Sequence, residues 1–582
     1  PTLNLARDPR WGRVEESYGE DPYLTGRMGI AMCQGMQGDD PKYLKTIAVP
    51  KHFAVHSGEI TRFYKSNDCP EPLIRDYYFP AFRDAFAEGG AMGTMIAFSG
   101  INGIPDTANK WLITDVLRNE WNYQGMVVSD NGGVPRLASA QHYVKTTREA
   151  VAAALNAGIT IIADYENPNW TPDILQSIRD GSLKQETVDR AVLCNLLLRF
   201  RLGEFDPPSK VPFIKIPASA IGSKENTALA LKTAQESFVL LKNDPAPRGY
   251  GFDKLLPLDL RKISSIALIG PRINSQPQFG AYSGVPANPS PTFRQALAAA
   301  LGDRVILRTA ISGDTEEAVA IAKSSDVVIF LGGINMEMEH ENTDRPNLYL
   351  PIEQTNLLPK LAAANPLLIV VLEGGSAMDL QWVKARAPAA MMIWYSGEQG
   401  ATALAQTLTG ESNPSGRLPL TFYRAAGDLP TFEDYDISHG RTYWYLPKEK
   451  PAAFPFGHGL SYTTFEYANL KSPAEAAPSD TIKLTLDVRN TGKQDGAEVV
   501  QLYVRENNAT TKIPRPLKQL KAFQRTEIPA GKTTTVTLTL PISSLAFWSM
   551  EAKKYVVDRG EYELQIGASS DDIRQTTKLT IK

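Results

Sequence analysis

The sequence predicts an α/β protein that ends in an all-β domain. Up to about residue 420 of the 582, short apolar runs alternate with helical stretches, a pattern typical of parallel sheets covered by helices. From about residue 465, apolar residues recur at every second position, as in antiparallel strands. We expect three domains and two linkers: 1–205 (barrel-like), 206–224 (linker), 225–440 (α/β sandwich), 441–464 (linker) and 465–582 (β-sandwich).

The first region contains four apolar runs with the length of buried strands. They are KTIAVPKHF (45–53), AMGTMIAF (91–98), GMVVSD (125–130) and AGITIIAD (157–164). Helical patterns such as 73–90 and 147–158 separate them, and a helix over 184–202 closes the region. Alternating strands and helices predict a parallel sheet, either open or closed into a barrel. The Pro-rich stretch 206–217 that follows is typical of a linker.

The second region again alternates strands and helices, and its strands end in glycine. The expected strands are KISSIALIG (262–270), SDVVIFLGG (325–333), PLLIVVLEGG (366–375) and AAMMIWYSG (389–397). Helices such as 353–365 lie between them, which predicts a doubly wound sheet. No GxGxxG follows any of these strands, so the sequence gives little support to a nucleotide site.

The last region changes to a period of two. Apolar and polar residues alternate in TIKLTLDVRNTG (481–492), EVVQLYVRE (498–506), TTTVTLTLP (533–541) and GEYELQIGAS (560–569). Turn residues bound each run, so we expect an antiparallel β-sandwich of the fibronectin type III kind.

Composition excludes several classes of protein. Lys and Arg number 61 against 64 Asp and Glu, a net charge of −3, which argues against a nucleic-acid binder. No apolar run reaches the roughly 18 residues of a membrane span. Three scattered cysteines, and the lack of HExxH and GxSxG motifs, predict no metal, no cofactor and no serine nucleophile. The sequence leaves a homodimer open.

Asp130 is the first candidate for chemistry. It follows the predicted strand MVVS, and Asn131, Gly132 and Gly133 leave space beside it. In a parallel βα barrel, residues at the carboxyl ends of strands face the active site. The alternative is that Asp130 caps the following helix, a role that aspartate also suits.

Three other stretches carry charged residues near predicted strand ends. Lys51 and His52 end the run TIAVP and could hold sugar hydroxyls or an anion, or could be a surface lysine beside a satisfied histidine. The Arg- and acid-rich stretch 4–24 could be a structural ion-pair network, or could direct Arg13 into a site. The acidic stretch 332–351 could lend a carboxylate to a neighbouring domain, or could be a solvated loop. Together they suggest two carboxylates, one attacking a sugar and one protonating the leaving oxygen.

Five motifs resemble those of the family 3 glycoside hydrolases and keep that family's order along nearly the whole chain. They are RDPRWGRVEESYGEDPYL (7–24), KHFAVH (51–56), NKWLITDVLRNEWNYQGMVVSD (109–130), GESNPSGRLPLTF (410–422) and FPFGHGLSYTTF (454–465). The resemblance implies a (β/α)8-like barrel, an α/β sandwich and a C-terminal fibronectin type III-like domain. It also implies retaining hydrolysis of terminal, non-reducing β-linked sugars in a secreted or periplasmic protein.

The resemblance implies a role for individual residues. Asp130 corresponds to the nucleophile, and Glu341, in ENTDR, to the general acid/base, with Glu339 as its rival. We expect the acidic neighbours of Glu341 to raise its pKa by like-charge repulsion. Substrate-binding positions fall on Arg13, Lys51, His52, Arg62 and Phe98.

The sequence departs from the family pattern at three places. Asn131 stands where many members have Trp or Cys after the nucleophile, which changes the leaving-group side. Phe98 stands where many have Tyr, so a hydroxyl that could bond the nucleophile is lost. The family's opening strands precede RDPRWGR, whereas this chain begins at Pro1, so we expect a further N-terminal segment that closes the barrel.

The sugar is predicted from the block EHENTDRPNLYLPIEQTNLL, which is more similar to the xylosidase branch than to the fungal glucosidase branch. We expect a β-xylosidase acting on xylo-oligosaccharides or aryl glycosides, with a β-glucosidase as the alternative. A β-N-acetylglucosaminidase using His56 is disfavoured because the C-terminal regions are all present. A non-catalytic sugar-binding protein is the alternative from another class.

Overall fold

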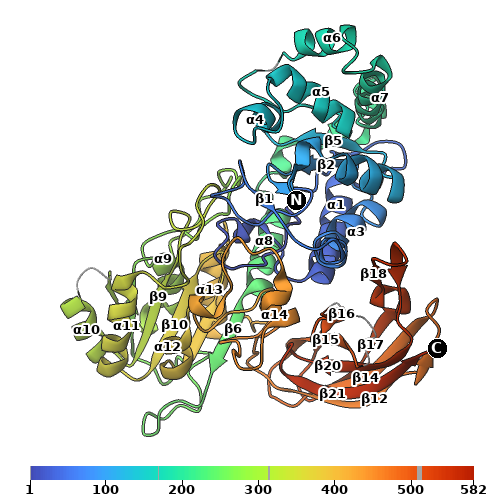
Figure 1. Ribbon diagram of the computed structural model, residues 1–582. Coiled ribbons are helices and arrows are strands. Elements are labelled where there is room, and N and C mark those ends of the chain that lie inside the picture. Colours follow the sequence, from blue (N-terminus) through green and yellow to red (C-terminus); the bar gives the residue numbers. More distant parts are fainter. Residues whose placement is uncertain (1, 168, 312–314, 508–513) are drawn as a thin grey trace.

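The computed structural model describes residues 2–167, 169–311, 315–507 and 514–582. An N-terminal α/β region, a six-stranded sheet flanked by helices and a β-sandwich follow one another along the chain (Figure 1). This matches the predicted α/β plus β architecture, while the predicted domain boundaries stay a prediction. No helix among the described residues combines the length and the apolar character needed to cross a bilayer.

The N-terminal region is built on an open arc of parallel segments. Strand β2 (Gly93–Ile96) pairs in parallel with β5 (Met126–Ser129). Single parallel bridges extend the arc on both sides: Thr2 with Lys51, Phe53 with Ile96, and Val128 with Ile161. The carboxyl ends of all these segments therefore meet at one edge.

Two predicted strands of this arc are wrong in their extent. Segment 45–53 touches its neighbours only through bridges, because Pro50 has no N–H to donate to a ladder. Segment 157–164 makes one bridge, because the N–H groups of Thr160 and Ile161 both donate to the carbonyl oxygen of Val127, which breaks the regular register. Both segments still lie where the alternation of strands and helices predicts them.

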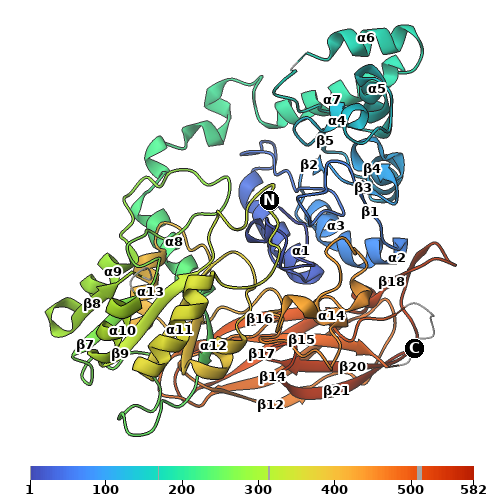
Figure 2. The same ribbon diagram turned by 60° about the vertical axis from the view of Figure 1, so that its left-hand side comes forward.

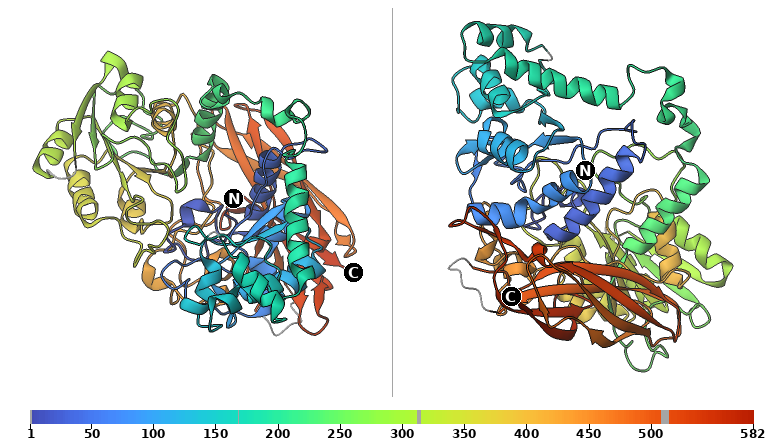
Figure 3. Two further views of the ribbon diagram at one scale, coloured as in Figure 1. Left: turned by 90° about the horizontal axis from the view of Figure 1, so that it is seen from above. Right: turned by 90° about the vertical axis from the view of Figure 1, so that its right-hand side faces the viewer.

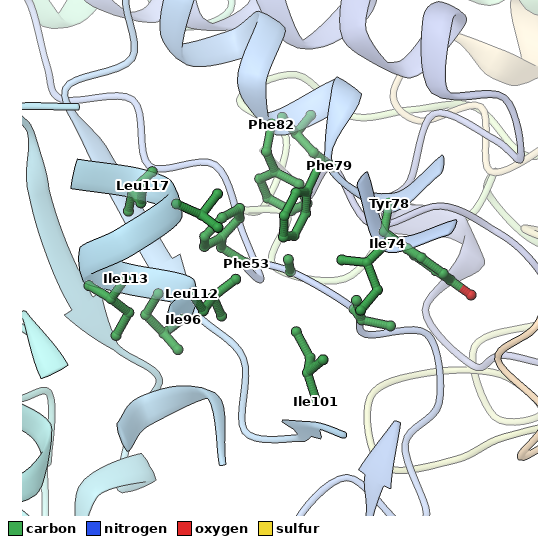
Figure 4. Close-up of a cluster of buried hydrophobic side chains, with 14 of the residues drawn as sticks. Phe53, Ile74, Tyr78, Phe79, Phe82, Ile96, Ile101, Leu112, Ile113 and Leu117 are labelled. Atoms are coloured by element: carbon green, nitrogen blue, oxygen red, sulfur yellow. The ribbon is translucent and has the colours of Figure 1, made fainter. Parts of the chain in front are cut away.

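Helices pack around this arc and bury an aromatic core. Figure 4 shows Phe53 of the arc against Phe79 and Phe82, with ring centroids 5.6 and 5.3 Å from that of Phe53. The helices are α1 (Pro22–Gln37), α2 (Glu71–Leu73), α3 (Pro80–Ala87), α4 (Gly133–Ser139), α5 (Thr147–Ala157), α6 (Thr171–Arg179) and α7 (Gln185–Arg201), with π-helical segments Ile74–Tyr78 and Trp111–Glu120. Short strands β1 (Ser66–Asn67), β3 (Gly100–Ile101) and β4 (Ile104–Pro105) form a separate small sheet. Figure 3 shows the chain leaving α7 and running down the outside of the molecule to α8 (Lys224–Ser237).

The second region is a six-stranded sheet with strand order β6-β11-β10-β9-β7-β8. Its strands are β6 (Val239–Asn243), β7 (Ser265–Ile269), β8 (Ile306–Ala310), β9 (Val327–Gly333), β10 (Leu368–Glu373) and β11 (Ala389–Met392), all parallel except β6. The helices α9 (Phe293–Leu301), α10 (Thr315–Lys323), α11 (Ile352–Ala364), α12 (Gln381–Arg386) and α13 (Gly400–Thr409) accompany it. All four predicted strands are present, and the two unpredicted ones, β6 and β8, lie at the edges.

The third region is a sandwich of a three-stranded and a five-stranded sheet. The strands are β12 (Phe465–Lys471), β13 (Glu475–Ala476), β14 (Thr481–Asn490), β15 (Gly496–Glu506), β16 (Gln519–Ile528), β17 (Thr533–Pro541), β20 (Gly560–Gly567) and β21 (Ile573–Ile581). Figure 2 shows this sandwich below the N-terminal region and beside the six-stranded sheet. A hairpin of β18 (Phe547–Ser549) and β19 (Lys554–Val556) reaches the N-terminal region, where the N–H of Trp548 donates to Asp76 Oδ1 at 2.8 Å.

Helix α14 (Thr442–Tyr445) joins all three regions. The buried Tyr443 hydroxyl donates to Asp21 Oδ2 at 2.7 Å and accepts the N–H of Leu520 at 2.8 Å. The N–H of Tyr443 donates to Glu20 Oε1 at 3.0 Å. One tyrosine thus contacts the N-terminal region and the β-sandwich together.

Candidate active site

Asp130 lies directly beyond β5, at the carboxyl edge of the arc. Its Oδ1 accepts the N–H of Asn131 at 2.8 Å, whereas its buried Oδ2 receives no hydrogen bond from the described residues. Helix α4 begins at Gly133 and is preceded by Gly132 at a φ of +72°, and no side chain of the described residues caps it. The capping alternative for Asp130 is therefore excluded, and one carboxylate oxygen is left without a partner.

His52 faces that oxygen, and Asn4 fixes its tautomer. Asn4 Nδ2 donates to the carbonyl oxygens of His52 (2.9 Å) and Ala54 (3.0 Å), so Asn4 Oδ1 is an acceptor. This Oδ1 lies 2.8 Å from the backbone N and 3.2 Å from Nδ1 of His52, so Nδ1 carries the proton. His52 Nε2 is then a bare acceptor, 3.5 Å from Asp130 Oδ2.

Burial shifts the pKa of both His52 and Asp130. It lowers the pKa of His52 well below the ordinary value, and the charges of Arg13, Lys51 and Arg62 act in the same direction. Burial also raises the pKa of Asp130, against the hydrogen bond from Asn131 and the same three cations. A neutral His52 that carries its proton on Nδ1 cannot donate to Asp130 from Nε2, so positive charges and not a hydrogen bond from His52 stabilise the carboxylate at Oδ2.

Arg13 connects this histidine to the second region. Its guanidinium binds Glu16 through Nε at 2.6 Å and Nη2 at 2.8 Å, a bidentate pair that fixes its plane. Its Nη1 lies 3.5 Å from His52 Nε2 and 3.4 Å from Glu341 Oε1. The stretch 4–24 is therefore both an ion-pair network and the element that directs Arg13 into the site.

Glu341 reaches this site from the loop that follows β9, in the second region. Arg62 Nη2 donates to its Oε1 at 2.9 Å, and the hydroxyl of Tyr282 donates to its Oε2. Burial tends to raise the pKa of Glu341, but the hydrogen bonds from Tyr282 and Arg62 and the charge of Arg13 hold it below the ordinary value. The expectation of a raised pKa is wrong, because the hydroxyl of Tyr282 and two arginines contact the carboxylate and outweigh its burial.

Glu339, the rival carboxylate, is fully buried within the second region. Its Oε1 accepts the N–H of Gly375 at 2.7 Å and the hydroxyl of Tyr395 at 2.8 Å. Its Oε2 accepts the hydroxyl of Ser376 and lies 3.9 Å from Arg345 Nη1. Every one of these contacts is internal to its own region, so of the two carboxylates only Glu341 contacts Arg13, which in turn contacts His52 beside Asp130.

Asp344 fastens the Glu341 loop to the N-terminal region. Its Oδ1 accepts the N–H of Gly12 at 2.9 Å, and its Oδ2 accepts those of Glu59 and Ile60 at 2.7 and 3.0 Å. Gly12 admits no side chain here, because a Cβ would lie 1.9 Å from the carbonyl oxygen of Thr343. Both oxygens of Asp344 thus accept backbone N–H groups of the N-terminal region, and these bonds hold the Glu341 loop against that region.

Replacing Asp344 by alanine is expected to lower the free energy of unfolding by about 2–4 kcal/mol, because three N–H groups at the contact lose their acceptor. Thermal melting with activity measured in parallel checks this, since the Glu341 loop is released at the same time. Asp344→Asn is the matched control, which keeps one acceptor oxygen and is expected to lose less. An unchanged melting temperature in Asp344→Ala would contradict the role of Asp344 as a fastening residue.

Phe98 and Phe63 form an aromatic pair beside the site, with ring centroids 4.9 Å apart. Two guanidinium groups flank it: Arg62 lies 5.1 Å and Arg136 5.0 Å from the centroid of Phe98. Phe98 therefore supports Arg62 by cation–π contact. It is mostly buried, and His52, not a tyrosine, is the neighbour of Asp130 Oδ2.

The structure brings all seven predicted site residues into this area and adds several that the sequence did not single out. Lys51 Nζ lies 3.8 Å from Glu16 and 4.5 Å from the ring centroid of Tyr282. Asn131 Oδ1 accepts the N–H of the exposed Tyr165 at 3.0 Å and so ties the neighbouring loop to the carboxyl end of β5. Asn4 and Glu16 lie in the charged stretch 4–24, whereas Tyr282 had no signal beyond a Gly-rich loop after a strand.

Comparison with known proteins identifies the family. The family model described as the glycosyl hydrolase family 3 N terminal domain matches residues 1–194, and that of its C-terminal domain matches residues 238–462. A β-xylosidase of Formosa agariphila is 34% identical over 100% of this chain and 83% of its own length. The chain belongs to glycoside hydrolase family 3. A fibronectin type III-like model matches residues 498–570, in agreement with the β-sandwich of this family 3 member.

Other family 3 members carry different sugar names. A periplasmic β-glucosidase of Salmonella typhimurium is 31% identical over 99% of the chain and 79% of its own length. The crystal structure of a Bifidobacterium adolescentis β-glucosidase of family 3 has a TM-score of 0.87 at 30% identity, covering 100% of this chain and 82% of the other. A family 3 exo-β-xylosidase in complex with a xylobiose aziridine probe has a TM-score of 0.88 at 28% identity, covering 100% and 78%. The chain is thus a glycoside hydrolase of the exo-acting β-glycosidase type, with oligosaccharides or other glycosides as substrates.

Proposed function

We propose that this family 3 enzyme is a retaining β-xylosidase with Asp130 as nucleophile and Glu341 as general acid/base. One observation carries the assignment: Arg13 Nη1 contacts both Glu341 Oε1 and His52 Nε2, and His52 Nε2 faces Asp130 Oδ2. Carboxylates from two separate regions of the chain thus border one set of cationic and hydrogen-bonding groups.

In the first step, Asp130 Oδ2 attacks the anomeric carbon while Glu341 protonates the glycosidic oxygen. Among the described residues, the attacking oxygen has no hydrogen-bond partner that it must leave. The bare Nε2 of His52 accepts from a sugar hydroxyl, and Lys51, Arg13 and Arg62 donate to others. Hydroxyls that draw the two arginines away from Glu341 Oε1 would raise the pKa of Glu341 and so favour its acid form.

In the second step, Glu341 acts as a base toward the water that frees the sugar from Asp130. The ionised carboxylate left by the first step is the form that the arginines and Tyr282 stabilise in the free enzyme. Two displacements at the anomeric carbon retain its configuration. Substrates in this scheme are xylo-oligosaccharides and aryl β-xylosides.

Xylose is supported by the motif that contains Glu341 and by relatives named β-xylosidase, from Formosa agariphila at 34% identity and Emericella nidulans at 32%. Glucose is the second candidate, supported by the relative named periplasmic β-glucosidase at 31% identity. That same name supports a secreted or periplasmic location.

Steady-state kinetics on 4-nitrophenyl β-xyloside and β-glucoside test the sugar. We expect kcat/KM to be at least about tenfold higher on the xyloside, roughly the effect of one hydroxymethyl group fitting or clashing in a closed site. A reversed ratio would assign the enzyme to glucose and leave the proposed roles of Asp130 and Glu341 intact. Proton NMR of the sugar first released tests retention separately, because an α-configured product would contradict the two-step scheme.

A further inference from the structure

Tyr282 comes from a segment of the chain that supplies none of the predicted site residues. It lies in the loop between β7 and α9, in the six-stranded-sheet region, and its side chain is largely solvated, with 71% of the residue exposed. Its φ of +60° is an uncommon conformation for a residue with a side chain. An exposed tyrosine would be free to turn into solvent, yet this one is directed at Glu341.

Within the described part of the chain, the side chain of Tyr282 makes its hydrogen bond and its cation–π contacts with groups of the site. Its hydroxyl donates to Glu341 Oε2. Its ring centroid lies 4.5 Å from Lys51 Nζ and 5.8 Å from Arg13 Cζ, within the range of cation–π attraction. The ring therefore covers two substrate-binding cations while its hydroxyl reaches the carboxylate.

The N-terminal region fixes the backbone that carries this tyrosine. The N–H of Ala281 donates to Glu15 Oε1 at 3.1 Å. Gly280 packs so closely that a Cβ there would lie 2.6 Å from Glu15 Oε2. Further back in the loop, the N–H of Gln278 donates to Glu373 Oε1 at 2.7 Å. The position of the Tyr282 ring thus follows from an anchored loop.

The two oxygens of Glu341 have different partners. Oε1 accepts from Arg62 at 2.9 Å and from Arg13 at 3.4 Å. Oε2 accepts from Tyr282 and is the oxygen that no arginine contacts among the described residues. An acid proton on Glu341 would therefore reside on Oε2, where it competes with the proton that Tyr282 donates.

We propose that Tyr282 is a positioning residue that sets the protonation of Glu341 through the hydrogen bond it donates to Oε2. The inference rests on the proposed acid/base role of Glu341. When Glu341 is ionised, Tyr282 donates and stabilises it. When Glu341 is protonated, Oε2 carries the hydrogen, and the tyrosine hydroxyl must rotate away for that hydrogen to reach the glycosidic oxygen. Tyr282 thereby limits the range of pH over which Glu341 serves as an acid.

Other charged or titratable groups near Glu341 act on the same equilibrium and come from three segments of the N-terminal region. They are Arg13 and Glu16, Lys51, and Glu59 and Arg62. Replacing Tyr282 by phenylalanine leaves all of them in position and removes only the donor. The variant Tyr282→Phe therefore isolates the hydrogen bond from the ring.

The pH dependence of kcat/KM on a 4-nitrophenyl glycoside tests this. Loss of a donor to an ionised carboxylate raises its pKa, and the acid must be protonated to act, so the basic limb of the profile moves to higher pH. We expect a shift of about 0.5–1 pH unit in Tyr282→Phe. Tyr250→Phe, at an exposed tyrosine remote from the site, is the matched control and is expected to leave the limb unchanged.

An unmoved basic limb in Tyr282→Phe, or an equal movement in Tyr250→Phe, would overturn the inference. Glu341→Gln separates this failure from that of the proposed function. If Glu341→Gln keeps full activity, the acid/base assignment itself fails. If Glu341→Gln is inactive and the Tyr282→Phe limb does not move, only the role of Tyr282 fails. Tyr282→Leu, which also removes the ring, is expected to raise KM as well, because Lys51 and Arg13 lose their cover.

Discussion

Replacing Asp130 by alanine is expected to lower kcat on a 4-nitrophenyl β-glycoside by about 10⁴-fold or more, because no other group can form the covalent intermediate. Asp130 Oδ2 lies beside His52 without a hydrogen-bond partner among the described residues, and alanine removes it. Steady-state rates at saturating substrate measure the loss. Asp164→Ala is the matched control, because Asp164 also follows the carboxyl end of an arc segment, and it is expected to stay within about tenfold of wild type.

Added azide gives a sharper test of the same residue. In Asp130→Ala a small anion can enter the space of the lost carboxylate and displace the leaving group once, so the glycosyl azide formed has inverted, α configuration. Product configuration is read by proton NMR. A β-configured azide from Asp130→Ala, or activity that survives the substitution, would refute the nucleophile assignment.

Replacing Glu341 by glutamine has the second largest expected effect, and that effect depends on the leaving group. For aglycones that need protonation, kcat/KM should fall by about 10²–10⁴-fold, because general acid catalysis is lost. For 2,4-dinitrophenyl glycosides, whose leaving group departs as a stable anion, the first step should change little. Comparing the two substrates isolates the acid function of Glu341 from its contacts with Arg13 and Arg62.

Azide should also rescue Glu341→Gln, with the opposite stereochemical outcome. Here Asp130 still forms the intermediate and azide replaces the deprotonated water, so two displacements give a β-configured azide. Glu339→Gln is the matched control: a variant of this buried residue is expected to lose stability and to slow both substrates alike. If Glu339→Gln showed the leaving-group dependence and Glu341→Gln did not, the two roles would have to be exchanged.

The sequence predicts the fold well where periodicity reports burial. Strands β9 and β10 are fully buried apolar runs, and the sequence predicts both. Strand β8 was not predicted because it is a partly exposed edge strand. Strand β6 was not predicted either; it pairs antiparallel at the other edge of the sheet. The run 45–53 was expected as a strand but makes only single bridges, since Pro50 interrupts hydrogen bonding. Apolar pattern alone does not distinguish a ladder from an extended segment held by isolated bridges.

The sequence predicts which residues meet at the candidate site, but not how their charges shift the pKa of Glu341. Lys51, His52 and Asp130 follow strand-like runs, so their meeting at one edge follows from a parallel arrangement. The lowered pKa of Glu341 depends on the hydrogen bond from Tyr282 and on Arg62 and Arg13, all of them distant from Glu341 in sequence. The prediction from the acidic neighbours along the chain therefore has the wrong direction for the pKa of Glu341, because contacts with residues distant in sequence outweigh those neighbours.

The β-sandwich contributes none of the proposed site residues, yet it touches both regions that do. On the N-terminal side its hairpin receives Arg75, whose guanidinium lies 3.7 Å from the centroid of the Trp548 ring, and Tyr555 donates to the Arg75 carbonyl oxygen at 2.9 Å. On the other side its Arg525 pairs with Glu236 of α8 at 3.0 Å. The sandwich is therefore packed against both regions that supply the proposed site residues, and we expect substitutions at these contacts to change how the two regions lie relative to each other without altering any group that meets the sugar.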